Sequence, residues 1–236
     1  MRKPAYLVFI ILTTAVLSML ITACKDKQTK EQEVVRPKMN QTKEPETSTK
    51  TEKKAILCFG NSLTAGYGLD EKEAWPQLMQ DRIDSLSLDY AVVNAGLSGE
   101  TTAGGLNRID WVLNQPVDIF FLELGANDML RGLDVKTTED NLKKIIEKVL
   151  KKYPGTPIVI AGMLAPPSMG KDYEKAFNNI FTKLSNDFKG HLIPFLLDGV
   201  AGNADLNLKD NKHPNQKGQK IVLENVWSAI EPLLSK

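Results

Sequence analysis

At residues 55–64 the chain reads AILCFGNSLT, and this stretch decides the fold. Its first five residues are apolar without a break, which is typical of a strand that is buried on both faces of a parallel sheet. Ser62 follows this run after only two further residues. The pattern therefore predicts a buried strand that ends close to a serine.

Apolar runs of the same kind recur along the chain and alternate with stretches of helical spacing. The clearest helix is predicted over 138–153, with Thr137 and Thr138 as candidate caps. Because parallel strands are joined by right-handed crossovers, five such βα units predict a three-layer α/β/α sandwich around a five-stranded parallel sheet in flavodoxin-like order. The predicted strands are 55–59, 90–93, 118–124, 157–161 and 192–196, and the other predicted helices are 71–86, 102–113, 172–188 and 215–234.

Residues 1–23 have the features of a signal peptide, with a basic start, a long apolar segment and a small-residue exit. Cys24 follows at once, and ITAC at 21–24 resembles the lipobox of bacterial lipoproteins, whose cysteine is acylated and becomes the mature N-terminus. Residues 24–54 are rich in Lys, Glu, Thr and Gln without apolar periodicity, and this composition predicts a disordered tether. We therefore expect an exported bacterial lipoprotein anchored to the cell envelope membrane, with a folded domain over 55–236.

Two other interpretations of this N-terminal region remain open. The apolar segment is long enough to stay in a bilayer as an uncleaved anchor. Residues 24–54 could also be an ordinary disordered extension that carries no lipid.

Charge argues against a nucleic-acid partner for the folded domain. The whole chain carries +1, whereas residues 1–54 carry +5, from two basic residues near the start and nine basic against six acidic residues in 24–54. Residues 55–236 therefore carry −4, which is unfavourable for binding a phosphate backbone.

The two cysteines, Cys24 and Cys58, form no CxxC redox or zinc motif. We expect Cys58, which lies inside an apolar run, to be a small buried hydrophobic residue. The chain also has no phosphate-loop, HExxH or dinucleotide-binding motif, and we expect no metal or other cofactor. The sequence makes no prediction about oligomeric state.

Polar residues follow four of the five predicted strands: Ser62, then 96–99, then 125–128, and finally 210–213 after the last strand. Open α/β sheets bind ligands beyond the carboxyl ends of their strands. We therefore expect these four segments to meet at one edge of the sheet.

Each of these segments has a simpler interpretation when it is taken alone. Ser62 could be only a helix N-cap, and Gly and Asn at 125–128 are ordinary turn residues. His213 would be a surface histidine if Ser62 were absent, although Pro214 places it at a predicted junction between loop and helix. The other histidine, His191, is predicted to lie in a surface loop. Serine, histidine and aspartate together are nevertheless the groups that acyl-transfer chemistry needs.

Four sequence blocks in this order resemble the SGNH hydrolases, also called GDSL esterases, over residues 55–236. The blocks are GNSLTAGYG at 60–68, NAGLSGETT at 94–102, GAND at 125–128, and Asp210 with His213-Pro214. Within that family the chain is most similar to bacterial arylesterase, thioesterase and lysophospholipase enzymes, and GMLAPP at 162–167 strengthens the likeness. The resemblance implies the flavodoxin-like fold of these hydrolases.

The resemblance also implies a role for individual residues. Ser62 would be the nucleophile, His213 the general base and then general acid, and Asp210 the group that orients His213. The oxyanion hole would consist of the backbone N–H groups of Ser62 and Gly99 and the side-chain amide of Asn127. These are suitable donors, because glycine permits close approach of the backbone and a neutral amide does not compete for the proton.

One departure from the family pattern is Asn61, where the family name has an aspartate. This residue precedes the nucleophile and is not part of the triad. We expect this departure to change the local hydrogen bonding more than the mechanism, and the rigidity of the loop and the pH profile are the properties that it puts in question. Thr64 also distinguishes the motif from the G-x-S-x-G elbow of α/β-hydrolases.

The expected substrate is a small-molecule or lipid acyl ester or thioester, and the apolar segment 163–170 is a candidate wall for its acyl chain, with Leu164 and Pro167 as candidate contacts. That segment could equally be a connection packed on the core. Two alternative functions stay open: a carbohydrate O-deacetylase that uses the same triad, and a binding lipoprotein without catalytic activity.

Overall fold

The computed structural model describes residues 53–235, which form a five-stranded, fully parallel sheet with the order β2-β1-β3-β4-β5. The strands are β1 (Lys54–Gly60), β2 (Tyr90–Gly96), β3 (Ile119–Glu123), β4 (Ile158–Ala161) and β5 (His191–Ile193). This order is that of flavodoxin-like folds, in which ligands bind where the order changes direction. The predicted α/β architecture and strand order are confirmed.

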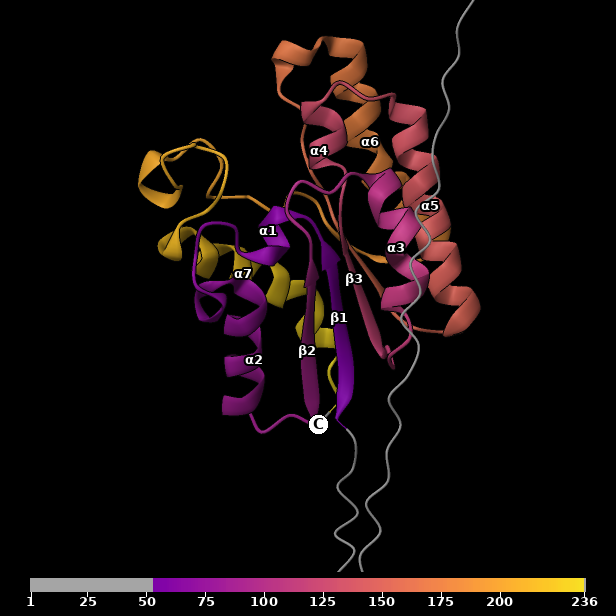
Figure 1. Ribbon diagram of the computed structural model, residues 1–236, viewed down its shortest axis with the longest axis vertical. Helices are drawn as coiled ribbons and strands as arrows, with labels where there is room; N and C mark the ends of the chain where they lie inside the picture. Colours follow the sequence, from indigo (N-terminus) through magenta and orange to yellow (C-terminus); the bar gives the residue numbers. More distant parts are fainter. Residues whose placement is uncertain (1–52, 236) are drawn as a thin grey trace, which may run out of the picture. The chain divides into compact units, whose positions relative to one another are not determined.

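Helices cover both faces of the sheet (Figure 1). One face carries α2 and α7, which pack on each other, and the other carries α3, α5 and α6. The helices are α1 (Ser62–Ala65), α2 (Trp75–Ser85), α3 (Thr102–Val112), α4 (Ala126–Leu130), α5 (Val135–Lys152), α6 (Lys171–Phe188) and α7 (Gln216–Ile230). Short 3₁₀ turns are η1 (Glu71–Glu73), η2 (Pro167–Met169), η3 (Ala204–Leu206) and η4 (Glu231–Leu233).

Prolines explain three differences from the predicted boundaries. The predicted helix 71–86 is divided into η1 and α2, because Pro76 cannot donate the hydrogen bond that a continuous helix would require. Pro232 likewise ends α7 at Ile230, and the chain continues as η4. The last strand stops at Ile193, before Pro194, where the sequence predicted a strand over 192–196.

Two further predictions were wrong in detail. His191 does not lie in a loop but begins β5, where it pairs with Val159 while its side chain remains exposed. The helix α5 starts at Val135 and is capped by Asp134, whose Oδ1 accepts a hydrogen bond from the Thr137 backbone N–H at 2.7 Å. An aspartate N-cap satisfies the same free N–H groups as the threonines that were predicted.

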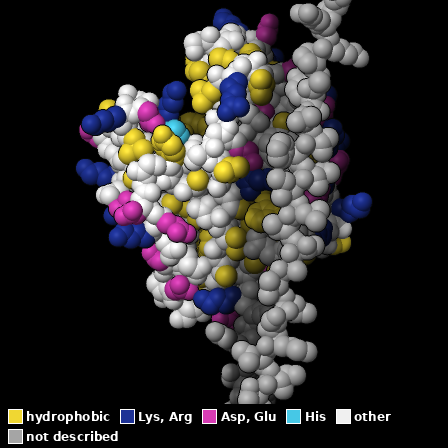
Figure 2. All heavy atoms as spheres, in the orientation of Figure 1, with side chains coloured by type: hydrophobic (Ala, Val, Ile, Leu, Met, Phe, Trp, Pro, Cys, Tyr) yellow, Lys and Arg dark blue, Asp and Glu magenta, His cyan; other side chains and the backbone are white. Residues whose placement is uncertain are grey.

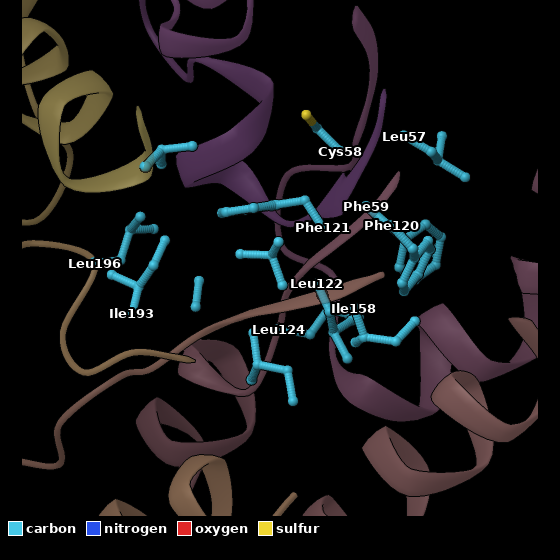
Figure 3. Packing of buried hydrophobic residues seen from close by; sticks show 14 of the residues in the cluster. Leu57, Cys58, Phe59, Phe120, Phe121, Leu122, Leu124, Ile158, Ile193 and Leu196 are labelled. Atoms are coloured by element: carbon cyan, nitrogen blue, oxygen red, sulfur yellow. The ribbon is translucent and has the colours of Figure 1, made fainter. Parts of the chain in front are cut away.

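The core is built from the central strands and the helices that face them (Figure 3). Phe59, Phe120 and Phe121 are completely buried, and so is Cys58, as predicted. Burial raises the pKa of the Cys58 thiol far above its ordinary value, which keeps it protonated and unreactive. Within residues 53–235 no helix has both the length and the apolar character needed to cross a bilayer.

The strand β1 begins at Lys54, one residue before the predicted domain boundary. Lys54 is paired with Tyr90 of β2, and its backbone N–H donates to the Asp89 carbonyl oxygen at 2.9 Å. The predictions for residues 1–52, including lipidation of Cys24, lie outside the described residues.

Candidate active site

The predicted catalytic serine lies at the carboxyl edge of the sheet, as the first residue of the short helix α1 and two residues after the end of β1. Its hydroxyl oxygen lies 2.9 Å from His213 Nε2, although the two residues are 151 positions apart in sequence. Ser62 is only 9% exposed. The fold thus delivers the serine of the first segment to the histidine of the last.

Asp210 completes a chain of hydrogen bonds from Ser62 through His213. Its Oδ2 lies 2.6 Å from His213 Nδ1, and its Oδ1 accepts from the backbone N–H groups of Lys212 at 2.9 Å and His213 at 3.1 Å. Partial burial of the carboxyl opposes its ionisation, but these hydrogen bonds outweigh that effect and lower the pKa of Asp210 to about 2. At neutral pH the group facing Nδ1 is therefore a carboxylate.

The ring of Tyr67 lies over the imidazole of His213, with 4.5 Å between ring centroids and 38° between planes. The loop that carries the histidine is also tied back, since the His213 carbonyl oxygen accepts from the Leu208 N–H at 2.8 Å. Tyr67 was not predicted as a site residue, and its place in the first block, five residues after Ser62, was the only available signal. The histidine is thereby restrained from its ring face and from its backbone.

Besides the Ser62 N–H, the candidate oxyanion donors come from the loop after β2, which holds Gly99, and from the short helix α4 after β3, which holds Asn127. Asn127 lines the same cavity as Ser62, and its side-chain amide donates to the Glu100 carbonyl oxygen at 2.9 Å. An amide nitrogen has two N–H groups, so one is left for a bound oxyanion. Gly99, adjacent to Glu100, has φ +80°, a conformation that favours glycine. The structure brings these two predicted segments together, and their catalytic roles stay predictions.

Buried acidic side chains support these two segments. Glu100 pairs with Arg108, whose Nε and Nη2 lie 2.6 and 2.5 Å from its oxygens. Asp128 accepts from the backbone N–H of Thr102 at 2.8 Å and from its hydroxyl at 2.6 Å. These side chains were not predicted as part of the site, since an acidic residue between a strand and a helix, or in a short helix, gives no sign of its burial in the sequence.

A third buried acid, Glu123, ends β3 directly behind the Ser62 turn. Its carboxyl accepts from the Asn61 side chain at 2.6 Å, from the Asn61 N–H at 3.0 Å and from the Thr64 hydroxyl at 2.9 Å. Burial raises the pKa of Glu123 to about 7, although these hydrogen bonds oppose the shift. The available sequence signal was a charged residue inside the apolar run FFLEL at 120–124.

A cavity of about 380 Å³ opens beside Ser62, Asn127 and His213. Its remaining wall is largely apolar and includes Leu63, Ala126, Met129, Leu130, Met163, Leu164, Phe195 and Leu197. Hydrophobic side chains also gather on the surface at the upper part of the molecule around this hollow (Figure 2). The cavity has the size and polarity of a site for a small apolar ligand.

Only one of the two predicted substrate contacts lies at the cavity. Leu164 lines it, whereas Pro167 does not, because Pro167 belongs to the exposed turn η2 beyond the rim. A larger depression of about 650 Å³ lies along α6 and contains none of the predicted site residues. In residues 53–235 no three His, Cys, Asp or Glu side chains cluster closely enough to hold a metal ion.

Residues 58–221 match the model of the GDSL-like lipase/acylhydrolase family. The chain belongs to this family. The matched region contains Ser62, Asn127, Asp210 and His213, and the resemblance inferred from the sequence blocks is confirmed.

Individual relatives are similar to this chain over about three quarters of its length. The chain is 36% identical over 180 residues to Esterase TesA of Pseudomonas aeruginosa, covering 76% of this chain and 89% of that protein. It is 34% identical over 181 residues to thioesterase 1/protease 1/lysophospholipase L1 of Escherichia coli, covering 76% and 85%. The structure of the psychrotrophic esterase EstA from Pseudoalteromonas sp., inhibited by monoethylphosphonate, matches with a TM-score of 0.71 and 36% identity, covering 75% and 97%.

Proposed function

We propose that this GDSL-family chain is a serine hydrolase that cleaves carboxylic ester or thioester bonds through an acyl-enzyme. The observation that carries the proposal is the continuous contact from Ser62 Oγ to His213 Nε2 and from His213 Nδ1 to Asp210, beside a largely apolar cavity. The names of the relatives, an esterase and a thioesterase/lysophospholipase, agree with this chemistry.

In the proposed reaction Ser62 Oγ attacks the acyl carbonyl carbon while His213 Nε2 accepts the hydroxyl proton. The tetrahedral intermediate bears a negative oxygen, for which the backbone N–H groups of Ser62 and Gly99 and the amide of Asn127 are the proposed donors. His213 then gives its proton to the leaving oxygen or sulfur, and the acyl group stays on Ser62. Water, activated by the same imidazole, releases the acid and restores the serine.

The apolar wall of the cavity supports an acyl chain as the part of the substrate that is held. Met163 and Leu164 come from the loop after β4, and Met129 and Leu130 come from α4. Burying an alkyl chain against such side chains stabilises the complex by about 0.8 kcal/mol for each methylene removed from water. The cavity also has polar side chains, those of Asn207, Asn211 and Lys212, from the segment that leads to His213. The wall formed by the methionine and leucine side chains offers a glycan no such group, and for that reason the acyl-hydrolase is favoured over the O-deacetylase.

The test is hydrolysis of p-nitrophenyl esters from acetate to palmitate by residues 53–236. We expect kcat/KM to rise from acetate to a medium chain length, by about fourfold for each methylene that is fully buried. Turnover confined to acetate, with selectivity for carbohydrate acetates, would instead identify an O-deacetylase. Absence of turnover on every ester and thioester would leave the binding lipoprotein as the explanation.

We further propose that the mature protein is a lipoprotein that carries its lipid on Cys24. This rests on the order of the N-terminal segments, a basic start, an apolar stretch, ITAC and a polar tether. The chain enters the folded domain at the amino end of β1, the opposite edge of the sheet from Ser62. A link at that end leaves the active-site edge free.

Mass analysis of the N-terminal peptide from membranes of a bacterial expression host tests the lipid. We expect a peptide that starts at Cys24 and carries added acyl mass, and we expect Cys24→Ser to abolish that mass. An unmodified peptide starting at Met1 would point to an uncleaved anchor, and a peptide cleaved without acyl mass would overturn the lipoprotein.

A further inference from the structure

Glu123 is an ionisable side chain that the proposed mechanism does not use, and it is buried at the centre of the site. It ends β3, is 1% exposed, and forms no ion pair among the described residues. Removing a carboxyl from water without a cationic partner is costly, so its hydrogen bonds must carry the compensation. All three of them come from the turn that holds Ser62.

These bonds hold the turn on both sides of the serine. The Asn61 side chain and backbone N–H donate from the residue before Ser62, and the Thr64 hydroxyl donates from the second residue after it. Gly60 makes the close approach possible, because a Cβ there would lie 2.7 Å from Glu123 Oε2 and 2.2 Å from Thr64 Oγ1. The Ser62 turn therefore rests directly on the carboxyl.

The orientation of the Asn61 side-chain amide is fixed by the contacts of its nitrogen and of its oxygen. Nδ2 faces Glu123, while Oδ1 accepts from the Leu63 N–H at 3.0 Å and lies 3.3 Å from Ser62 Oγ. The serine hydroxyl has one proton, and its competing acceptor is His213 Nε2 at 2.9 Å. Small displacements of this amide therefore change which acceptor the serine faces.

We propose that Glu123 is a positioning residue for Ser62. It acts through Asn61, whose side-chain NH₂ donates a hydrogen bond to the Glu123 carboxylate. The proposal rests on the proposed role of Ser62 as nucleophile. In this contact the Glu123 carboxylate only accepts hydrogen bonds, and the Asn61 side chain provides the N–H group that donates to it. An aspartate at position 61 would instead place two carboxylates face to face, and such a pair holds together only by sharing a proton.

Other charged groups near the turn do not replace this contact. Arg108 reaches the Gly60 carbonyl oxygen at 3.4 Å but pairs with Glu100, and His213 approaches from the cavity side of Ser62. The influences on the pKa of Glu123 are burial and hydrogen bonds from Asn61 and Thr64. A change at position 61 therefore acts on the carboxyl directly.

The test exchanges donor and acceptor across this contact, using Glu123→Gln, Asn61→Asp and the double variant. In E123Q the new NH₂ group faces a donor in either orientation, the Asn61 side-chain NH₂ or the Asn61 backbone N–H. We expect kcat to fall on the order of 100-fold with little change in KM, as for a misplaced reacting group. In N61D we expect kcat to fall as pH rises, because the shared proton is lost, and this alkaline limb is absent from the parent. The double variant restores one donor opposite one acceptor, and kcat should recover by on the order of 10- to 100-fold over E123Q, without the alkaline limb.

The melting temperature of each variant is measured to check that it folds, and a matched control variant is assayed in parallel. Glu147→Gln removes an exposed glutamate on α5 and should leave kcat and its pH profile unchanged. If E123Q does not fold, Thr64→Val removes one of the three bonds and should still lower kcat more than KM. Single variants with parental kcat, or a double variant no better than E123Q, would overturn the positioning role. Those results would leave the proposed function intact, because that function is tested separately, by turnover of the parent on esters and by its loss in Ser62→Ala.

Discussion

Replacing Ser62 by alanine is expected to lower kcat/KM for a p-nitrophenyl ester by on the order of 10⁴- to 10⁶-fold. The oxygen removed is the one that lies 2.9 Å from His213 Nε2, and no acyl-enzyme can form without it. The remaining donors of the site would sustain only a small residual rate. Initial rates of the purified variant and the parent, on the same ester, give the comparison.

Folding and labelling controls separate this chemical loss from a structural one. Ser168→Ala changes an exposed serine in η2 and should keep the parental rate. A phosphonate ester should label the parent on Ser62 and leave S62A unlabelled, while both show the same melting temperature. Equal labelling and equal turnover in S62A would mean that another residue attacks the substrate.

The sequence predicts the fold well where burial makes a continuous pattern. The run AILCF at 55–59 is read as a strand because both of its faces are covered, and Ile56, Leu57, Cys58 and Phe59 are indeed completely buried. Parallel strands then force Ser62, Asn127 and Asp210 to one edge, whatever their separation in sequence. Boundaries were less predictable where Pro76 or Pro194 interrupted a pattern that hydrophobicity alone would extend.

The supporting side chains of the site were not predictable in the same way. Glu123 ends a strand that reads as apolar, and its role depends on contacts with Asn61 and Thr64, about 60 residues earlier. Pro167 shows the opposite limit, since it is apolar and close in sequence to Leu164, yet it is exposed and does not line the cavity. Sequence proximity places a residue in a segment, but tertiary contacts decide which side chain faces the ligand.

Buried acidic side chains lie behind the active-site segments, although burying a carboxyl group lowers the stability of the fold. Among the described residues, Glu100, Asp128 and Glu123 are the buried acidic side chains, and each lies behind one of the segments that carry Gly99, Asn127 or Ser62. For Glu123 the folded pKa lies above the ordinary value, so the free energy of unfolding decreases as pH rises from about 4.5 to about 7, by about 3 kcal/mol. Such a cost is typical of a functional site.

Asp210→Asn is expected to lower kcat by on the order of 10³- to 10⁴-fold while leaving the fold intact. The carboxylate accepts the proton of His213 Nδ1 and so keeps Nε2 free to accept the serine proton. An asparagine amide can turn an N–H toward Nδ1, which moves the ring proton to Nε2, where it faces Ser62 and prevents the general-base step. Stopped-flow or steady-state rates on a p-nitrophenyl ester measure the loss.

The pH dependence of stability gives a second, independent readout of the same contact. Because hydrogen bonds lower the folded pKa of Asp210 below its ordinary 3.8, to about 2, its stabilising effect is present above pH 3.8 and is lost as pH falls through 2. D210N removes that titration, so its unfolding free energy should vary less than that of the parent between these values. Asp198→Asn, at an exposed aspartate in the loop before α7, is the control and should leave both kcat and the pH dependence of the unfolding free energy unchanged. A D210N variant with parental kcat would show that His213 is oriented without its carboxylate, because the backbone bond to Leu208 and the ring of Tyr67 would then be sufficient.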